Sequence, residues 1–323
     1  MGVLQPGAAA LSLVAQTTSR HFATTRHWPL PPELTIAVDR VDCSVEPGQT
    51  LGVVGESGSG KSTLARLMLG LLEPTSGRIE FDRKPIARFG RAQRRAFRQA
   101  VQPIFQDPRS SLNWRHSIQT IITEPLGNFG YGQEERIRRA HALLEQVRLP
   151  THILRRQTSD VSGGQLQRVA IARALALDPL YLICDEPLSA LDVSVQAGVL
   201  NLLLELQSSR RLAMMFISHD LEVVRHVSDR VIVMYHGAVM EDAPAVDLYR
   251  QPRHPYTQVL LGRASPLPED AAAPATVSTP ASRTIDSHCP FADRCPIRQS
   301  RCFEERPLLR EVAPGHMAAC HFA

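Results

Sequence analysis

Residues 55–63, Gly55-Glu-Ser-Gly-Ser-Gly-Lys-Ser-Thr63, are the stretch that decides the fold of this chain. They match the pattern G-x-x-x-x-G-K-[ST], they follow the apolar run Thr50–Val54, and they precede a segment of good helix formers, Leu64–Leu69. Between a strand and a helix, the glycines of this pattern let the backbone turn tightly and direct successive N–H groups toward a phosphate. We therefore predict a Walker A phosphate-binding loop in an α/β fold with a parallel sheet.

The residue types in this loop suit phosphate and metal binding. Lys61 supplies a compact positive charge for the β- and γ-phosphate oxygens, and Ser62 supplies a hydroxyl ligand for Mg²⁺. Lysine is rare in this chain: Lys84 is the only other lysine, and the remaining Lys or Arg positions are all arginine. The loop residues predicted to bind ATP are Gly55, Glu56, Ser57, Gly58, Ser59, Gly60, Lys61, Ser62 and Thr63.

The composition is that of a folded globular protein with one large domain or two smaller ones. The chain has 323 residues, of which 43% are hydrophobic, and its formal net charge is +4. This hydrophobic content excludes disorder throughout the chain, and so small a net charge does not indicate a nucleic-acid partner. The best apolar run, near Val199–Leu206, is interrupted by Asn201 and Glu205. We therefore expect no segment of the ~18–20 apolar residues that would span a bilayer.

Two further segments have the chemistry of an ATP site. The apolar run Leu180–Cys184 predicts a buried strand, and it ends at Asp185, a ligand for Mg²⁺, and Glu186, a general base for the attacking water. On its own this acidic pair is a common pattern. Upstream, Ser162-Gly-Gly-Gln165 comes directly before a probable helix, and helix N-termini bind anions.

The order of these motifs resembles that of the ATP-binding-cassette (ABC) ATPases: Val161-Ser-Gly-Gly-Gln165, the acidic pair, Ser189-Ala-Leu-Asp192 and Ser218-His219-Asp220. The resemblance implies that the signature residues of one cassette close on the γ-phosphate held by the Walker A loop of a second cassette, so that hydrolysis requires a dimer. Val161 departs from the usual leucine of the signature. The signature and neighbouring residues that the resemblance places at the nucleotide are Ser162, Gly163, Gly164, Gln165 and Asp192.

The same resemblance assigns three more positions. Gln106, in Ile104-Phe-Gln-Asp-Pro108, matches the loop glutamine that contacts Mg²⁺ and the attacking water. His219 matches the switch histidine that contacts the γ-phosphate, although before the resemblance is counted it could equally be a core histidine. Phe22 matches the aromatic residue that stacks on adenine, with Trp28 as the nearby alternative.

Longer stretches resemble one branch of the family, the dipeptide and oligopeptide importer ATPases. These stretches are residues 106–113, residues 189–196 and His254-Pro-Tyr-Thr-Gln258. The branch implies that ATP binding and hydrolysis drive the uptake of peptides or a related small solute. The implied partners are two transmembrane permease subunits, an external solute-binding protein and a second ATPase subunit, which the branch makes an unlike chain in a heterodimer, with a second copy of this chain as the alternative. The implied location is peripheral, on the cytoplasmic face of the bacterial inner membrane. The alternative is a soluble ABC ATPase acting on the ribosome or on nucleic acid.

Four of the six cysteines lie near the C-terminus, at Cys289, Cys295, Cys302 and Cys320. In a reducing compartment this clustering favours a metal over disulfides. The spacing matches neither the usual zinc pattern nor the common ferredoxin patterns, so the residues alone leave zinc and iron–sulfur open. The importer resemblance favours a [4Fe–4S] cluster, with Zn²⁺ as the alternative. The other two cysteines, Cys43 and Cys184, lie in apolar runs and are expected in the core.

We expect an ABC-type nucleotide-binding domain with a helical subdomain and a Cys-rich C-terminal extension. The predicted ranges are an N-terminal extension at 1–20, the ATP-binding domain at 21–263 with its helical subdomain at about 107–160, a linker at 264–282, and the extension at 283–323. Because the Pro- and Ala-rich linker separates the extension from the ATP motifs, we expect a separate appendage. Loss of its metal cluster should affect assembly or local stability before it affects nucleotide affinity.

Overall fold

The computed structural model describes residues 12–24, 33–265 and 288–323, which form two compact units. The first unit consists of Val45–Thr50 and Phe81–Ile217, and the second of the described parts of Leu13–Ser44, Leu51–Glu80 and Ser218–Ala323. Trp28, most of the predicted linker and much of the predicted N-terminal extension lie outside the described residues.

The first unit has a parallel sheet at its centre. Its strands are β6 (Val101–Ile104), β7 (Tyr181–Asp185) and β8 (Ala213–Ile217), and β7 pairs in parallel with both neighbours. Every residue of β7 and β8 is buried, as expected for parallel strands covered on both faces. The predicted buried strand before Asp185 is confirmed, and it places this carboxylate at the carboxyl end of the sheet.

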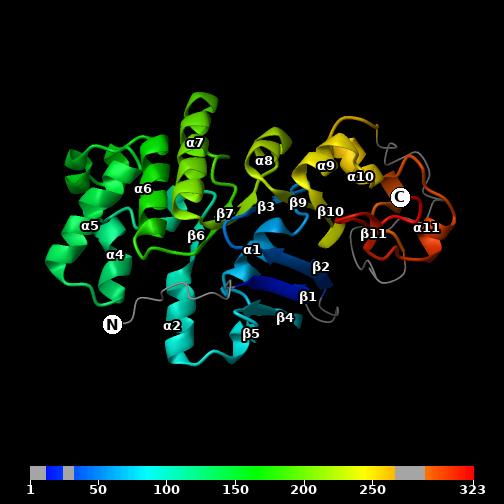
Figure 1. The fold of residues 1–323 in the computed structure, drawn as a ribbon, viewed down its shortest axis with the longest axis horizontal. Coiled ribbons are helices and arrows are strands. Elements are labelled where there is room, and N and C mark those ends of the chain that lie inside the picture. Colours follow the sequence, from blue (N-terminus) through cyan, green and yellow to red (C-terminus); the bar gives the residue numbers. More distant parts are fainter. Residues whose placement is uncertain (1–11, 25–32, 266–287) are drawn as a thin grey trace. The chain divides into compact units, whose positions relative to one another are not determined.

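The helices of the first unit include a group that packs together at the left of Figure 1, formed by α4, α5 and α6. Their mutual contact is apolar, with Ile122 and Leu126 of α4 and Leu144 of α5 buried. The helices are α2 (Arg91–Ala100), α3 (Pro108–Ser111), α4 (Ile118–Asn128), α5 (Gln133–Gln146), α6 (Gly163–Leu175) and α7 (Val193–Arg210). The short elements are β5 (Lys84–Pro85) and the 3-10 turns η1 (Ile86–Arg88), η2 (Thr151–Arg155) and η3 (Thr158–Asp160). The segment 107–160 is therefore mainly helical, and its status as a separate subdomain stays a prediction.

The second unit contains two sheets. One has the strand order β2-β1-β4, with β1 at Leu13–Thr24, β2 at Glu33–Val45 and β4 at Ser76–Phe81. The other has the order β11-β12-β10-β9-β3. Its strands are β3 (Thr50–Val54), β9 (Arg230–Tyr235), β10 (Ala238–Pro244), β11 (Arg310–Ala313) and β12 (His316–Ala318). In this second sheet β3 and β9 are parallel, and the remaining pairs are antiparallel.

The C-terminal segment is part of this second sheet. Strand β12 pairs with β10 in the register Glu241 to Ala318 and Asp242 to Met317, and the N–H of Ala319 donates to the carbonyl oxygen of Met240 at 2.8 Å. This differs from the expectation of a separate appendage. Paired backbone groups fix β12 against β10, because a strand that leaves its partner must exchange these hydrogen bonds for hydrogen bonds with water.

The helices of the second unit are short, and two of them carry residues of the candidate site or its neighbours. Helix α1 (Lys61–Met68) follows β3, and α10 (Pro255–Leu260) begins at the predicted branch motif. The remaining elements are α8 (Leu221–Val227), α9 (Ala245–Arg250), α11 (Arg301–Glu304) and the 3-10 turn η4 (Ala292–Arg294).

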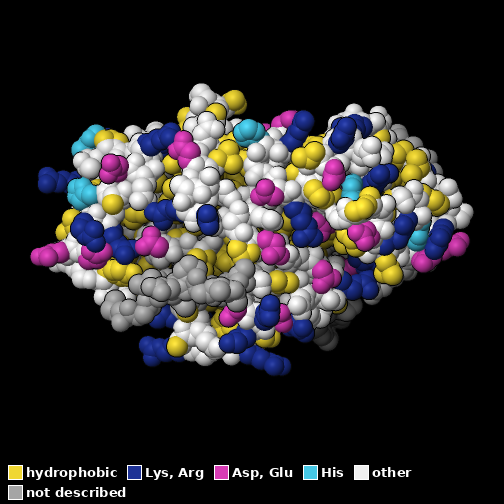
Figure 2. All heavy atoms as spheres, viewed as in Figure 1, with side chains coloured by type: hydrophobic (Ala, Val, Ile, Leu, Met, Phe, Trp, Pro, Cys, Tyr) yellow, Lys and Arg dark blue, Asp and Glu magenta, His cyan; other side chains and the backbone are white. Residues whose placement is uncertain are grey.

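The surface shows mixed charge. On the face in Figure 2, Lys and Arg side chains are interspersed with Asp and Glu side chains. Within the described ranges, no helix has both the length and the apolar character needed to cross a membrane.

Candidate functional site

The predicted Walker A loop joins β3 to α1 and needs its glycines for conformation and for space. Gly55, Gly58 and Gly60 have φ values of 149°, 80° and 100°. A Cβ atom on Gly55 would lie 2.1 Å from the carbonyl oxygen of Met234, and one on Gly60 would lie 2.0 Å from that of Ala37. Only glycine fits at both positions, so the loop is fixed by its neighbours on two sides.

Lys61 begins α1 and is buried, with 4% of its surface exposed. Its Nζ atom donates to the carbonyl oxygens of Gly55 and Glu56, both at 2.8 Å, and lies 3.3 Å from Ser59 Oγ. The loop therefore surrounds the ammonium group, and these hydrogen bonds offset the unfavourable free energy of burying its charge. Ser62 and Thr63 follow in the first turn of the same helix.

Glu56 is held by two residues from far along the chain. Arg294 forms a two-bond ion pair with its carboxylate, with Nη1 2.9 Å from Oε2 and Nη2 3.1 Å from Oε1. The N–H of Glu56 donates to the hydroxyl of Tyr256 at 2.9 Å. Sequence reasoning included Tyr256 in a branch motif, and it gave neither Tyr256 nor Arg294 a role. The Cys-bearing tail, residues 288–323, thus contacts the predicted Walker A loop, which differs from the expectation that the linker keeps them apart.

The segment that supplies Tyr256 is organised by a buried carboxylate. Glu241 is fully buried, and it accepts hydrogen bonds from the N–H groups of Arg253 at 2.7 Å and His254 at 2.9 Å. Nε2 of His316, in the C-terminal segment, lies 2.6 Å from the same carboxylate. A buried carboxylate without such partners would be costly, so Glu241 ties the C-terminal strand to the start of α10.

His254 caps α10 in its neutral form. Burial lowers the pKa of His254 to about 4, although a hydrogen bond with the backbone of Ala319 acts in the opposite direction. The ring is therefore neutral near pH 7, and its Nδ1 accepts the N–H of Tyr256 at 3.0 Å. Pro255 occupies the first turn of the helix, where a missing N–H costs nothing. These features fix Tyr256 beneath the nucleotide loop.

In the first unit, the predicted glutamine and the predicted general base lie together. Nε2 of Gln106 donates to Oε2 of Glu186 at 2.9 Å. Asp185 is 7% exposed at the end of β7, and Glu186 follows with a φ of 47°, a left-handed conformation that is unusual outside glycine. The N–H of Glu186 donates to the carbonyl oxygen of Ile217 at 3.0 Å, which holds this turn against β8.

The predicted signature forms the N-terminus of α6. Ser162 is exposed, its Oγ accepts from the N–H of Gln165 at 3.3 Å, and the Gln165 side chain accepts from the N–H of Ser162 at 3.0 Å. This reciprocal pair is a capping box. Gly164 lies against α7, since a Cβ there would be 2.4 Å from a methyl group of Val195, and Gly163 precedes it in the first turn. Asp192 is exposed at the start of α7.

Two more of the predicted site residues lie in the second unit. His219 is exposed directly after Ser218, whose N–H donates to the carbonyl oxygen of Val53 at 3.3 Å. His219 therefore follows the position where the chain meets the end of β3. Phe22 lies on β1, and the guanidinium carbon of Arg20 is 4.8 Å from the centre of its ring. The roles of His219 and Phe22 toward a nucleotide stay predictions.

The four C-terminal cysteines are buried near one another. Burial above all, together with the neighbouring thiols of Cys302, Cys295 and Cys320, raises the pKa of Cys289 to about 12. The N–H of Cys289 also donates to the carbonyl oxygen of Cys302 at 2.9 Å. Four thiols suit zinc or iron chemically. Across the described residues, however, no group of three or more His, Cys, Asp or Glu side chains has an arrangement that could hold a metal ion.

The remaining two cysteines are core residues, as predicted. Cys43 and Cys184 are both buried, and burial raises the pKa of each thiol, that of Cys43 to about 12. Neutral thiols of this kind pack as small apolar side chains.

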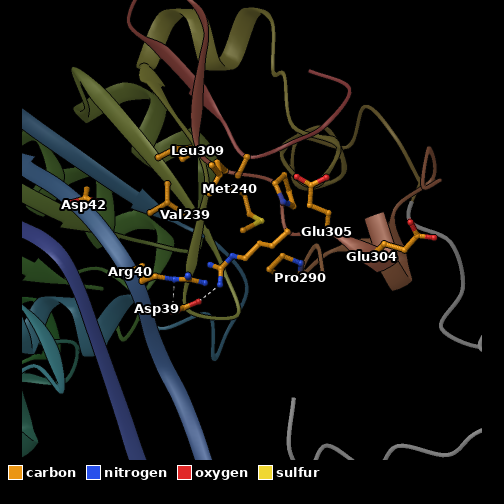
Figure 3. Close-up of a pocket in the computed structure, with 13 residues that line it drawn as sticks. Asp39, Arg40, Asp42, Val239, Met240, Pro290, Glu304, Glu305 and Leu309 are labelled. Carbon is orange, nitrogen blue, oxygen red and sulfur yellow. Dashed lines mark hydrogen bonds and ion pairs between the residues drawn. The ribbon is translucent and has the colours of Figure 1, made fainter. Parts of the chain in front are cut away.

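A cavity of about 610 Å³ lies between β2, β10 and the C-terminal segment. Figure 3 shows Asp39, Val239, Met240 and Glu305 around it. Nη1 of Arg306 donates to Oδ2 of Asp39, so the cavity is bordered by a second ion pair between the C-terminal segment and the cassette. None of the residues predicted to bind nucleotide is among its described lining residues.

Two family models match the chain. The model described as "ABC transporter" matches residues 38–189, and the one described as "Oligopeptide/dipeptide transporter, C-terminal region" matches residues 240–302. The first match includes the predicted Walker A loop, signature and acidic pair. The second begins in β10 and ends at Cys302.

Curated relatives cover nearly the whole chain. A putative peptide import ATP-binding protein of Brucella ovis is 47% identical over 288 residues, covering 88% of this chain and 90% of that protein. The oligopeptide transport ATP-binding protein AppF of Bacillus subtilis is 45% identical over 294 residues, covering 88% and 89%.

Solved structures share the fold. The ATP-binding cassette MJ0796, in a dimeric post-hydrolysis state bound to ADP and Pi, has a TM-score of 0.64 and 26% identity, covering 72% of this chain and 98% of that chain. The structure of cbiO1 from Clostridium perfringens, part of the ABC transporter complex cbiONQ, has a TM-score of 0.64 and 28% identity, covering 75% and 92%.

Proposed function

We propose a function from one premise: this chain belongs to the ATP-binding cassette (ABC) family of transporter ATPases. Membership follows from 47% identity to a relative over 88% of the chain. The predicted α/β cassette fold is confirmed, and the chain is an ATP-hydrolysing subunit of a transporter.

The transported solute that we propose is a peptide. The observation that carries this proposal is the joint match of one chain to the ABC transporter model and to the oligopeptide/dipeptide transporter C-terminal region. Relatives in Brucella ovis and Bacillus subtilis are named for peptide import and oligopeptide transport. The solute itself does not contact this subunit, because its work is to bind and hydrolyse ATP.

Each predicted site residue has a proposed part in that work. Lys61 and the loop N–H groups bind the ATP phosphates, and Ser62, Gln106 and Asp185 would hold Mg²⁺, which neutralises phosphate charge when bound. Glu186 accepts a proton from the attacking water, and its hydrogen bond with Gln106 supports a shared position at the reacting phosphate. His219 contacts the γ-phosphate and Phe22 stacks on adenine.

A second cassette completes the proposed site. The exposed N-terminus of α6, with Ser162, Gly163, Gly164 and Gln165, faces the nucleotide of the other cassette, and Asp192 lies at the same junction. We propose that this second cassette is an unlike subunit, so that the pair is a heterodimer. Its further partners are two transmembrane permease subunits and an external solute-binding protein.

The proposed location is the cytoplasmic face of the bacterial inner membrane, where the chain is held by the permeases. Partners of this kind make a direct test possible. Purified from detergent-solubilised membranes, a tagged copy of this chain should bring two multi-spanning membrane proteins with it in equal amounts. In cells that lack the chain, uptake of labelled peptide should be lost and should return with the wild-type gene only. Unchanged peptide uptake without the chain would overturn the proposal.

The rival function, action on ribosomes or nucleic acid, gains no support from the net charge or from the face shown in Figure 2. Its partner is a polyanion, which calls for a continuous basic face. The formal net charge is +4, and Figure 2 shows basic and acidic side chains interspersed on the face in view.

We further propose that Cys289, Cys295, Cys302 and Cys320 hold a [4Fe–4S] cluster, with Zn²⁺ as the alternative. Support comes from the burial of all four thiols and from their mutual effect on the pKa of Cys289. Binding would require these thiols to lose their protons and to draw together. Protein prepared without oxygen should contain about four irons per chain and absorb broadly near ~400 nm, and Cys295→Ser should remove both. One zinc and no iron would replace the cluster with a zinc site, and protein free of both metals would refute either form.

A further inference from the structure

We propose that Arg294 is a positioning residue for the nucleotide loop: through the carboxylate of Glu56 it holds the loop in the conformation that binds the phosphates of ATP. The Cys-bearing tail is then a working part of the ATP site in its own chain. This inference rests on the proposed role of residues 55–63 in nucleotide binding.

The contact has the geometry of a specific ion pair. Two nitrogens of one guanidinium meet the two oxygens of one carboxylate at 2.9 and 3.1 Å, an arrangement that fixes direction as well as distance. The side chains of Arg294 and Glu56 are 23% and 39% exposed, so water screens the pair only in part. A pair of this kind restricts the loop more than a typical surface pair.

Glu56 transmits this restriction to the lysine that meets the phosphates. Its side chain is held by Arg294, its N–H by the Tyr256 hydroxyl at 2.9 Å, and its carbonyl oxygen accepts from Lys61 Nζ at 2.8 Å. A shift of Glu56 would move a carbonyl that orients the ammonium group. Arg294 therefore acts on the phosphates through Glu56 and Lys61 without contacting them.

Arg294 itself is held in place by an aromatic group. It ends the turn η4, and its N–H donates to the carbonyl oxygen of Phe291 at 3.2 Å. The Phe291 ring is 1% exposed and lies 5.4 Å from the Tyr235 ring and 5.2 Å from the Tyr256 ring, centre to centre. The guanidinium carbon of Arg294 is 6.0 Å from the centre of the Tyr235 ring. Packed aromatic rings leave the arginine little freedom to leave the loop.

If the ion pair only fastened the tail, removing it would lower the stability of the protein and leave nucleotide affinity unchanged. The positioning role predicts the reverse. The tail has other attachments: β12 pairs with β10, His316 contacts buried Glu241, and Arg306 donates to Asp39. With these in place, the fold does not depend on Arg294. Removing the guanidinium should therefore change nucleotide affinity more than it changes the stability of the nucleotide-free protein.

The test is a double-mutant cycle in the full chain, with Glu56→Gln, Arg294→Gln and the double variant. Equilibrium titration with a fluorescent ATP analogue and Mg²⁺ measures affinity, and thermal unfolding without nucleotide measures stability. Each single variant should weaken affinity about three- to tenfold, and the double variant should be no weaker than either. Arg294→Lys should recover part of the loss. In steady state, KM should rise with little change in kcat, because Arg294 does not contact the reacting atoms.

The chain offers a matched control in Arg301. This arginine also lies beside a tail cysteine and pairs with a glutamate, since its Nε is 2.8 Å from Glu305 Oε2, but both side chains are more than half exposed. Arg301→Ala should leave affinity within twofold of wild type.

Two outcomes would overturn the inference: a folded Arg294→Gln with wild-type affinity, or losses in the two single variants that simply add in the double variant. If Arg294→Gln does not fold, Glu56→Gln decides by the same affinity measurement. Lys61→Ala distinguishes failure of the Arg294 inference from failure of its premise, which is that residues 55–63 bind nucleotide. If Lys61→Ala binds the analogue as tightly as wild type, the proposed nucleotide site is wrong; if Lys61→Ala loses binding and the cycle shows no coupling, only the role of Arg294 is wrong.

Discussion

At the scale of single residues, the proposed general base is a carboxylate in an unusual backbone conformation. Glu186 has a φ of 47° and accepts a hydrogen bond from Gln106 at 2.9 Å. Non-glycine residues with this φ are uncommon, and they concentrate at functional sites, where surrounding contacts maintain them. The proposed role of Glu186 as general base agrees with this local geometry.

Glu186→Gln should retain ATP binding and lose turnover. The amide keeps the shape of the carboxylate but cannot accept a proton from water, so the rate should fall by at least about 10²-fold. Hydrolysis assays and nucleotide titrations on the same preparation check both parts. A near-normal rate, in protein shown to be free of contaminating ATPase, would remove Glu186 from this role.

Several of these residues could be recognised from the sequence because local patterns determine them. The glycines at 55 and 60 belong to a short motif, and the structure shows close backbone neighbours at both. Arg294 could not be recognised in this way, since its partner Glu56 is 238 positions away and neither residue lies in a pattern that names the other. Long-range ion pairs depend on how separate elements pack, which the local sequence does not specify.

At the scale of elements, α10 is capped by a histidine that must stay neutral. The pKa of His254 is about 6.5 in an unfolded chain and about 4 in the fold. Between these values the unfolded chain binds a proton that the folded chain does not, so the free energy of unfolding falls as the pH is lowered below 6.5.

The contribution of His254 to this loss should reach about 2 kcal/mol at pH 5. Urea unfolding at pH 7 and pH 5 measures it, with His254→Asn as the matched variant, because asparagine keeps a capping acceptor but does not titrate. The variant should lose less stability between the two pH values than wild type does. Equal losses would show that His254 does not carry this pH dependence.

Helix α6 offers a second test at this scale, because the capping box places exposed Ser162 at its start. Ser162→Arg should spare nucleotide binding by the monomer and block ATP-driven dimerisation, since a long charged side chain would occupy the proposed contact with the other cassette. Light scattering with and without ATP checks this in a Glu186→Gln background. Ser162→Ala is the control, because it removes the helix cap without adding bulk. Loss of the cap should lower the free energy of unfolding by about 1 kcal/mol. Undiminished dimerisation of Ser162→Arg would contradict the proposed geometry.

The strands show where sequence reasoning stops. The predicted strands around 50–54 and 180–184 are confirmed as β3 and β7, because fully buried parallel strands have continuous apolar runs. The short strands β11 and β12 have no such run. They pair with each other, and β12 also pairs with β10, which lies far earlier in the chain. The sequence therefore predicted a separate appendage, whereas β11 and β12 are strands of a sheet in the second unit.

At the scale of the whole molecule, the chain is an ATPase subunit whose C-terminal segment is joined to the nucleotide loop. Tyr256 and Arg294 both contact Glu56, and both follow the start of the segment at 240–302 that matches the oligopeptide/dipeptide transporter C-terminal region. Arg294 directly precedes Cys295, so a change at the cysteines would shift Arg294 and, through its ion pair with Glu56, the loop. Cys295→Ser should therefore lower nucleotide affinity in the direction of Arg294→Gln, which differs from what the linker alone suggests.

The central claim is that ATP hydrolysis by this chain drives peptide import. Its most direct test is the ATPase rate of the complex reconstituted in lipid vesicles with its permeases, measured with and without peptide-loaded solute-binding protein on the external side. We predict that the loaded binding protein raises the rate several-fold, and that Glu186→Gln in this chain abolishes most of the increase. A rate that does not respond to peptide, or an increase that survives Glu186→Gln, would contradict the account.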